Sequence, residues 1–144
     1  MWNPLIYKKA LLFAAQAHKG QRVPGNFRVD GPQAATEASE TAPLLVLEEI
    51  PYVTHLVMVA NHVLLAYHQQ PTFDIDLALQ CALLHDVLED TATPANQVEA
   101  HFGAAVLAGV EALTKNSHIE KARQMPDSLE RILVQPQEVA IVKM

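Results

Sequence analysis

The sequence predicts an all-α protein, built as an array of about six to eight helices. Signals for β-strands are almost absent, apolar residues recur at helical spacing in successive segments, and Pro or Gly separates those segments. Hydrophobic residues make up 50% of the chain and aromatic residues only 6%, so the core should be aliphatic. At 144 residues the chain is long enough for a substantial core, and we expect residues 1–144 to form a single domain.

Two helices are expected in the first half of the chain, over residues 4–18 and 52–69. Pro4 suits a first helical turn, Gly20 is a plausible stop for the first helix, and Pro71 ends the second. Their apolar stripes comprise Ile6, Ala10, Phe13, Ala14 and Ala17 in the first helix, and Val53, Val57, Ala60, Leu64 and Tyr67 in the second, where Leu56 and Val63 widen the stripe.

Residues 26–50 separate these helices and are expected to be a surface insertion. Residues 32–43 are rich in Ala, Thr, Ser and Glu, as in a flexible loop. Residues 44–50 are apolar enough to pack as a short strand or a turn.

The stretch at residues 77–91, LALQCALLHDVLEDT, is the centre of the predicted fold. Its first half is apolar on nearly every side, which is typical of a helix buried among others. Asp74 or Asp76 is placed to cap its start. We therefore expect a central helix over residues 77–88, with Cys81 buried in it as a thiol.

Shorter helices should follow the central one. Thr93 and Pro94 are typical of a helix start, as cap and first turn, and Gly103 should end that helix. The remaining helices are expected at residues 104–113, at 118–124, from a cap at Asp127 onward, and from Pro136 through 139–142. The last of these has no stop signal before Met144, so we expect it to be incomplete.

Charge and cysteine content narrow the function classes. The formal net charge is −6 with no basic run, which argues against binding to nucleic acid or to an anionic membrane as the main activity. A small anionic substrate remains compatible, since a bound metal can invert the local field.

A single cysteine allows no internal disulfide and fits a reducing compartment. With no signal-peptide pattern and no apolar run of membrane-spanning length, we expect a cytoplasmic protein. Nothing in the sequence indicates the oligomeric state.

The central stretch ends in four ionisable residues: His85, Asp86, Glu89 and Asp90. If the helix continues, Glu89 lies one turn beyond His85, and Asp90 one turn beyond Asp86. Buried carboxylates need a partner, and a divalent cation accepts imidazole and carboxylate ligands. Two acids beside such a metal could perform acid–base chemistry. The alternative is a helix end with solvated acids and a core histidine, which a His-Asp pair alone does not exclude.

Three other residues also have two interpretations. His55 is either a core or capping histidine or a metal ligand. Arg22, in a loop, is either an ordinary surface arginine or a planar cation offered to a phosphate or a purine. Lys115 is either solvated or directed at an anionic ligand. His62 and His68 are expected on the surface.

Motifs spread over nearly the whole chain resemble the HD-type metal-dependent phosphohydrolases. They are Ala10-x-x-Phe13-Ala14-x-x-Ala17-His18-x-Gly20-Gln21-x-x-Pro24-Gly25, Pro51-Tyr52-x-x-His55, Ala82-Leu83-Leu84-His85-Asp86-Val87-Leu88-Glu89-Asp90-Thr91, Phe102-Gly103, Leu113-Thr114-Lys115 and Val139-Ala140-Ile141-Val142-Lys143-Met144. More narrowly, they resemble the hydrolase domain of RelA/SpoT homologues and the small alarmone hydrolases. Residues 26–50 lie outside the resemblance.

The resemblance implies an HD-domain helical array with an Mn²⁺-type site, or a site for another divalent cation. His55, His85 and Asp86 match metal ligands of that family, whereas Glu89 and Asp90 match the acids that position or activate the attacking water. The implied reaction removes the 3′-pyrophosphate of guanosine 3′,5′-bis(diphosphate) (ppGpp) or of its pentaphosphate form (pppGpp), giving GDP or GTP.

The substrate side of the implied site is less complete. Arg22 matches a basic residue beside the guanine base, and Lys115 matches a position near the substrate pocket. The intervening residues 26–50 are longer than the family's usual connection and could move Arg22 relative to the metal.

One implied ligand has no counterpart in this sequence. The fourth metal ligand of the family is an aspartate in an Ala-Asp-Arg-type motif, which would begin after Met144. We therefore expect a chain truncated before that aspartate, with weak Mn²⁺ binding and slow hydrolysis. The sequence is also compatible with two alternatives: an HD phosphatase acting on another nucleotide, and a catalytically impaired nucleotide-binding or regulatory member.

Overall fold

The computed structural model describes residues 2–23, 27–29, 45–47 and 49–143. The helices there are α1 (Pro4–Ala17), α2 (Val53–Gln69), α3 (Ile75–Leu84), α4 (Val87–Asp90), α5 (Ala95–Phe102), α6 (Ala104–Leu113), α7 (Lys121–Leu133) and α8 (Gln137–Lys143). The two strands are β1 (Phe27–Val29) and β2 (Leu45–Leu47). The predicted all-α class is confirmed.

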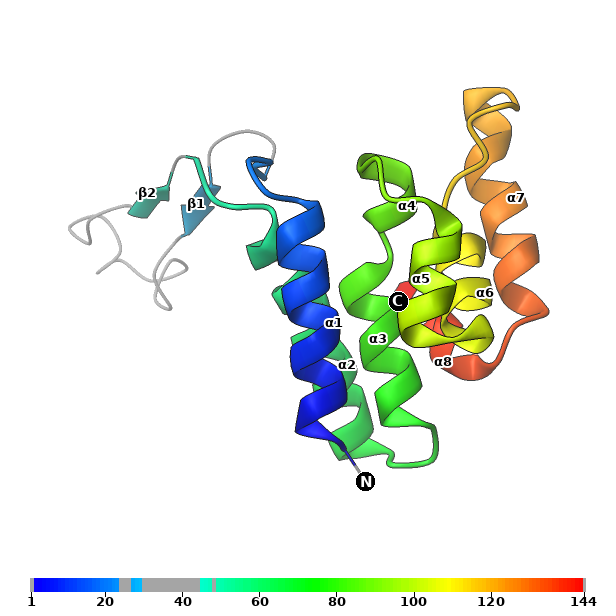
Figure 1. Cartoon of the computed structure of the whole chain (residues 1–144), viewed down its shortest axis with the longest axis horizontal. Helices are drawn as coiled ribbons and strands as arrows, with labels where there is room; N and C mark the ends of the chain where they lie inside the picture. The colour runs from blue at the N-terminus through cyan, green and yellow to red at the C-terminus, as the bar shows by residue number, and fades with distance from the viewer. Residues whose placement is uncertain (1, 24–26, 30–44, 48, 144) are drawn as a thin grey trace, which may run out of the picture.

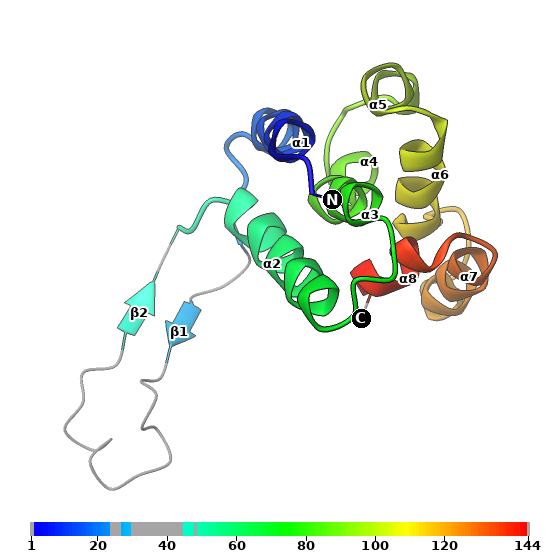
Figure 2. The same ribbon diagram turned by 90° about the horizontal axis from the view of Figure 1, so that it is seen from below.

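Helix α3 is the centre of the fold. It packs against α1 and α2 on one side and against α6 and α8 on the other, and both views show it between these groups (Figures 1 and 2). Its buried residues are Ile75, Ala78, Leu79, Cys81, Ala82, Leu83 and Leu84. The side chain of Asp74 caps the helix, accepting a hydrogen bond from the Leu77 N–H at 3.2 Å. The predictions of a buried central helix, its acidic cap and a buried Cys81 are therefore confirmed.

The central helix is shorter than predicted. The continuous helix expected over residues 77–88 is wrong, since α3 ends at Leu84 and α4 begins only at Val87. At the break, Asp86 has φ −102° and ψ 1°. His85 Nδ1 lies 2.6 Å from the Ala82 carbonyl, so the ring satisfies one of the free carbonyls at the helix end. The break places His85 and Asp86 in a turn between two helices.

The C-terminal part differs from expectation at α7. The helix runs through Pro126, so the two separate helices predicted there are one, and Asp127 forms an ion pair with Arg131 at 3.0 Å instead of capping a new helix. An internal proline costs a helix about 3 kcal/mol. Tertiary contacts offset this cost: Ser128 and Ile132 are buried, and Ser128 Oγ donates to the Ala112 carbonyl of α6 at 2.8 Å.

The start of α5 and the buried face of α2 also differ from the predictions. Thr93 does not cap α5: Pro94 immediately precedes it, with no side-chain cap. In α2 the fully buried residues are Leu56, Ala60 and Val63. Of the residues predicted as the main buried stripe, only Ala60 is fully buried. Leu56 and Val63, which were expected only to widen that stripe, form the centre of the buried face instead.

The strands form a two-stranded antiparallel hairpin, with Phe27 opposite Leu47. In both views the hairpin stands away from the helices (Figures 1 and 2). Of the two alternatives predicted for residues 44–50, a short strand or a turn, the structure has the strand, at Leu45–Leu47, whereas the loop predicted at 32–43 lies outside the described residues. The single-domain organisation and the surface insertion stay predictions.

Within the described ranges, no helix has both the length and the apolar character needed to cross a membrane.

Candidate metal centre

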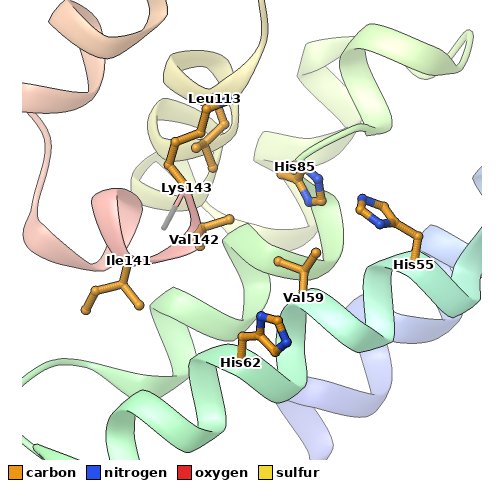
Figure 3. Close-up of a pocket in the computed structure, with 8 residues that line it drawn as sticks. All are labelled: His55, Val59, His62, His85, Leu113, Ile141, Val142 and Lys143. Carbon is orange, nitrogen blue, oxygen red and sulfur yellow. The ribbon is translucent and has the colours of Figure 1, made fainter. Parts of the chain in front are cut away.

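Two imidazoles and one carboxylate converge where the start of α2 meets the end of α3. His55 lies in the first turn of α2, and His85 and Asp86 form the turn after α3. Asp86 Oδ2 is 3.0 Å from His85 Nε2 and 3.8 Å from His55 Nε2. One ligand atom from each of the three residues lies within 4.8 Å of the others. The convergence predicted for His55 and His85 is present, and Figure 3 shows the two rings close together.

The helix end determines the orientation of the His85 ring. Its Nδ1 is directed at the Ala82 carbonyl, which can only accept, so Nδ1 carries the hydrogen. The lone pair of Nε2 in the neutral ring then faces Asp86 and His55. In metal-binding histidines, the ring nitrogen that does not bind the metal usually donates to a carbonyl or carboxylate in this way.

The His85–Asp86 pair shifts both pKa values toward the charged forms. Burial alone would raise the pKa of Asp86, but the hydrogen bond from His85, the charge of that ring and the Tyr52 hydroxyl outweigh it and lower the pKa to about 2. Burial alone would lower the pKa of His85, and the contact with Asp86 reverses this, so the pKa is raised. The pKa of His55 is lowered, first by burial and then by the neighbouring His85.

Asp86 also belongs to a second group, which consists of three acids. Asp86, Glu89 and Asp90 also have ligand atoms within 4.8 Å of one another, because α4 turns Glu89 and Asp90 back toward Asp86. Glu89 Oε1 accepts a hydrogen bond from the Lys115 N–H at 2.9 Å. The pKa of Asp90 is raised, first by burial and then by the charges of Asp86 and Glu89. Two acids with different surroundings thus lie beside the three donor residues.

The donor set fits a divalent transition-metal ion. It offers two ring nitrogens and a carboxylate that is ionised at neutral pH, a set that Mn²⁺, Fe²⁺ and Zn²⁺ all accept. Without a cation, His85 must be protonated to pair fully with Asp86, and His55 has only the more distant contact. We therefore interpret the group as a candidate metal centre.

A cavity of about 300 Å³ opens beside the two imidazoles. Its lining residues are His55, Val59, His62, His85, Leu113, Ile141, Val142 and Lys143, as Figure 3 shows. No role at this site was predicted for His62 or Lys143. His62 is exposed as predicted, but it lies on the same side of α2 as His55, at a spacing of two turns.

The two residues expected to contact substrate lie elsewhere. Lys115 is exposed and lines a separate cavity of about 310 Å³ with Leu88 and Arg131. Only its backbone N–H contacts the acid group. Arg22 pairs through its backbone with Pro51, and its guanidinium lies 3.5 Å from the Glu49 carbonyl. Neither residue is among those that line the cavity beside His55 and His85.

Three residues join the acids to α1 and α2. The Tyr52 hydroxyl donates to Asp86 Oδ2 at 2.7 Å, the Gln21 amide donates to the Asp90 carbonyl at 2.7 Å, and His18 contacts Gln21. No role was predicted for these three residues, although all of them belong to the motifs that resemble the HD-type phosphohydrolases. Tyr52 lies three residues before His55, a spacing that places two side chains side by side on a helix, and this spacing was the signal that Tyr52 lies near the site.

The chain is similar in sequence to several curated proteins. No family model matches the chain. A human protein named guanosine-3′,5′-bis(diphosphate) 3′-pyrophosphohydrolase MESH1 is 42% identical over 74 residues, which are 51% of this chain and 39% of that protein. The Xenopus tropicalis protein of the same name is 31% identical over 136 residues, or 94% of this chain and 62% of that protein. A Vibrio cholerae guanosine-3′,5′-bis(diphosphate) 3′-pyrophosphohydrolase is 31% identical over 64% of this chain and 13% of its own length.

The fold of the chain is also similar to that of a solved structure. A solved structure of a metazoan SpoT orthologue that hydrolyses ppGpp matches with a TM-score of 0.66 and 26% identity, over 99% of this chain and 66% of that one. The chain spans less than half the length of the mouse and human relatives that it matches. In sequence and in fold, the chain is thus similar to proteins named guanosine-3′,5′-bis(diphosphate) 3′-pyrophosphohydrolase and to a metazoan SpoT orthologue that hydrolyses ppGpp.

Proposed function

We propose that this chain hydrolyses ppGpp or pppGpp, releasing the 3′-pyrophosphate and leaving GDP or GTP. The observation that carries the proposal is the convergence of His55, His85 and Asp86 beside Glu89 and Asp90, in a chain similar to ppGpp pyrophosphohydrolases. The reaction needs water, a group that takes the water's proton and a positive charge near the phosphoryl oxygens.

His55, His85 and Asp86 would hold the divalent ion, and Mn²⁺ is our proposed ion. When bound, such an ion supplies a positive charge that polarises a phosphoryl oxygen and acidifies a water. Ionised Asp86 offsets the charge of the ion. A cytoplasmic location, like the choice of Mn²⁺, stays a prediction.

Glu89 and Asp90 would orient the attacking water and manage its proton. The Lys115 N–H fixes one carboxylate oxygen of Glu89 and leaves the other free. The raised pKa of Asp90 suits a group that holds a proton during part of the cycle. Lys143 and His62 on the wall of the cavity are further candidates to contact the anionic substrate, whereas Arg22 beside the guanine base rests on the resemblance alone.

The test measures pyrophosphate and GDP released from ppGpp by the full chain with Mn²⁺ and with a chelator. Hydrolysis should require the metal, and Glu89→Gln should lower kcat by about 10²-fold or more while Mn²⁺ binding persists. Glu99→Gln, on the exposed surface of α5, is the matched control and should not change kcat.

Three outcomes would contradict parts of the proposal. Unchanged turnover in Glu89→Gln would remove Glu89 from the chemistry. Faster hydrolysis of another nucleotide than of ppGpp would favour a different HD phosphatase. Mn²⁺ binding without pyrophosphate release would favour a nucleotide-binding member without turnover.

A further inference from the structure

The hydroxyl of Tyr52 lies between the carboxylates of Asp86 and Asp90. It donates to Asp86 Oδ2 at 2.7 Å and is 3.5 Å from Asp90 Oδ2. Tyr52 immediately precedes α2, so its ring is one turn before His55, with ring centres 5.4 Å apart. A single hydroxyl thus contacts the carboxylate of the donor group and approaches an acid outside that group.

Buried contacts from α1 fix the ring of Tyr52. The His18 ring stacks on it at 4.8 Å with an interplanar angle of 28°, and His18 is only 2% exposed. The Tyr52 N–H also donates to the Gln21 carbonyl at 2.9 Å. The stacked His18 ring and the hydrogen bond from the Tyr52 N–H to Gln21 together leave the phenol ring little freedom to turn away from Asp86.

The histidine itself is held by a bond of defined direction. The amide of Gln21 donates to the Asp90 carbonyl, so its Oε1 is the acceptor for His18 Nδ1 at 2.9 Å. His18 Nε2 is then a buried acceptor, and it has no hydrogen-bond partner among the described residues. An unpaired buried nitrogen costs stability, which indicates that the histidine serves more than packing.

We propose that Tyr52, supported by His18, is a positioning residue for the metal centre. Its hydroxyl holds Asp86 in the rotamer that turns Oδ2 toward both imidazoles, and it keeps the Asp90 carboxylate beside that group. Without the hydroxyl, Asp86 keeps only its contacts with the two imidazoles, so its carboxylate is held less firmly in the position that brings the three donor atoms together. This inference rests on the proposed function, since it requires a cation and a substrate at the same place.

The test removes only the hydroxyl. Tyr52→Phe should raise the dissociation constant for Mn²⁺, measured by titration calorimetry on the full chain, by about 10- to 100-fold. At saturating Mn²⁺ its kcat for ppGpp should stay lowered while KM changes little, because the tyrosine acts through the acids and not through the substrate.

Tyr67→Phe is the matched control. It also removes a tyrosine hydroxyl, but from a residue near the other end of α2, about 20 Å away along the helix. There Tyr67 packs against Phe73. Its Mn²⁺ affinity and kcat should equal those of the unmodified chain. A general loss of packing around tyrosines would instead weaken both variants.

The outcomes separate the two proposals. If Tyr52→Phe binds Mn²⁺ as tightly as the unmodified chain, the positioning role is wrong and the proposed function stands. If the unmodified chain neither binds Mn²⁺ nor releases pyrophosphate, the proposed function fails, and the positioning role fails with it.

Discussion

At the scale of single residues, His85 shows how one contact selects the chemistry of a side chain. Its Nδ1 satisfies the end of α3, and its Nε2 is 3.0 Å from Asp86. Folding therefore favours the protonated ring of the metal-free protein: this contribution to stability is complete below about pH 6.5 and is lost as the pH rises through the raised folded-state pKa of His85.

Metal binding should have the opposite pH dependence. A cation requires the neutral imidazole, so Mn²⁺ competes with a proton that Asp86 holds on His85. We expect Mn²⁺ affinity, measured by calorimetry, to increase as the pH rises from about 6.5 through the folded-state pKa of His85. His68→Gln, at the exposed end of α2, should leave the profile unchanged. An affinity that is constant across this range would show that His85 is not a ligand.

At the scale of elements, the packing of α6 depends on one buried glycine. A Cβ placed on Gly109 would lie 2.7 Å from Cys81 Sγ of α3 and 3.0 Å from Val139 Cγ2 of α8. Because real side chains do not approach so closely, α6 can pack this near to both helices only without a side chain at this position.

Gly109→Ala should therefore destabilise the protein. Alanine gains up to about 1 kcal/mol in helix propensity, but overpacking a core costs about 1–3 kcal/mol, so we expect a net decrease in the free energy of unfolding in urea. Cys81→Ala removes the nearer contact. The double variant should accordingly lose less stability than the sum of the two single variants. A Gly109→Ala protein that is as stable as the parent would contradict this close packing.

At the scale of the whole molecule, the candidate metal centre joins two helices that only tertiary packing brings together. His55 begins α2, and His85 with Asp86 follows α3. A cation held by all three would bind the folded chain and not the unfolded one.

Mn²⁺ should therefore raise the melting temperature of the chain, by an amount that grows with its concentration. At 100 times the dissociation constant the stabilisation is about 2.7 kcal/mol. His55→Ala should abolish the shift measured by scanning fluorimetry, whereas His68→Ala should keep it. If both variants keep the full shift, the ion binds at a different site.

The sequence by itself determined the features that depend on neighbouring residues. Helix boundaries at Pro4 and Gly103, the cap at Asp74 and the burial of Cys81 follow from local geometry and from apolar periodicity, and the structure agrees with each. The residue types of the candidate site were also evident from the sequence, because His, Asp and Glu side chains can bind a metal or transfer a proton in any fold.

Only the tertiary structure decided how those residues meet. The single helix through Pro126 is held by contacts with α6 that outweigh local propensity, and at the helix break Asp86 is held by the Tyr52 hydroxyl. The bond from Tyr52 to Asp86 spans 34 residues, and that from Gln21 to Asp90 spans 69. Periodicity and caps act over a few residues, whereas these bonds depend on how α1, α2 and α3 pack. The spacing of Tyr52 and His55 placed Tyr52 near the site, but no local pattern could show which atoms these bonds would join.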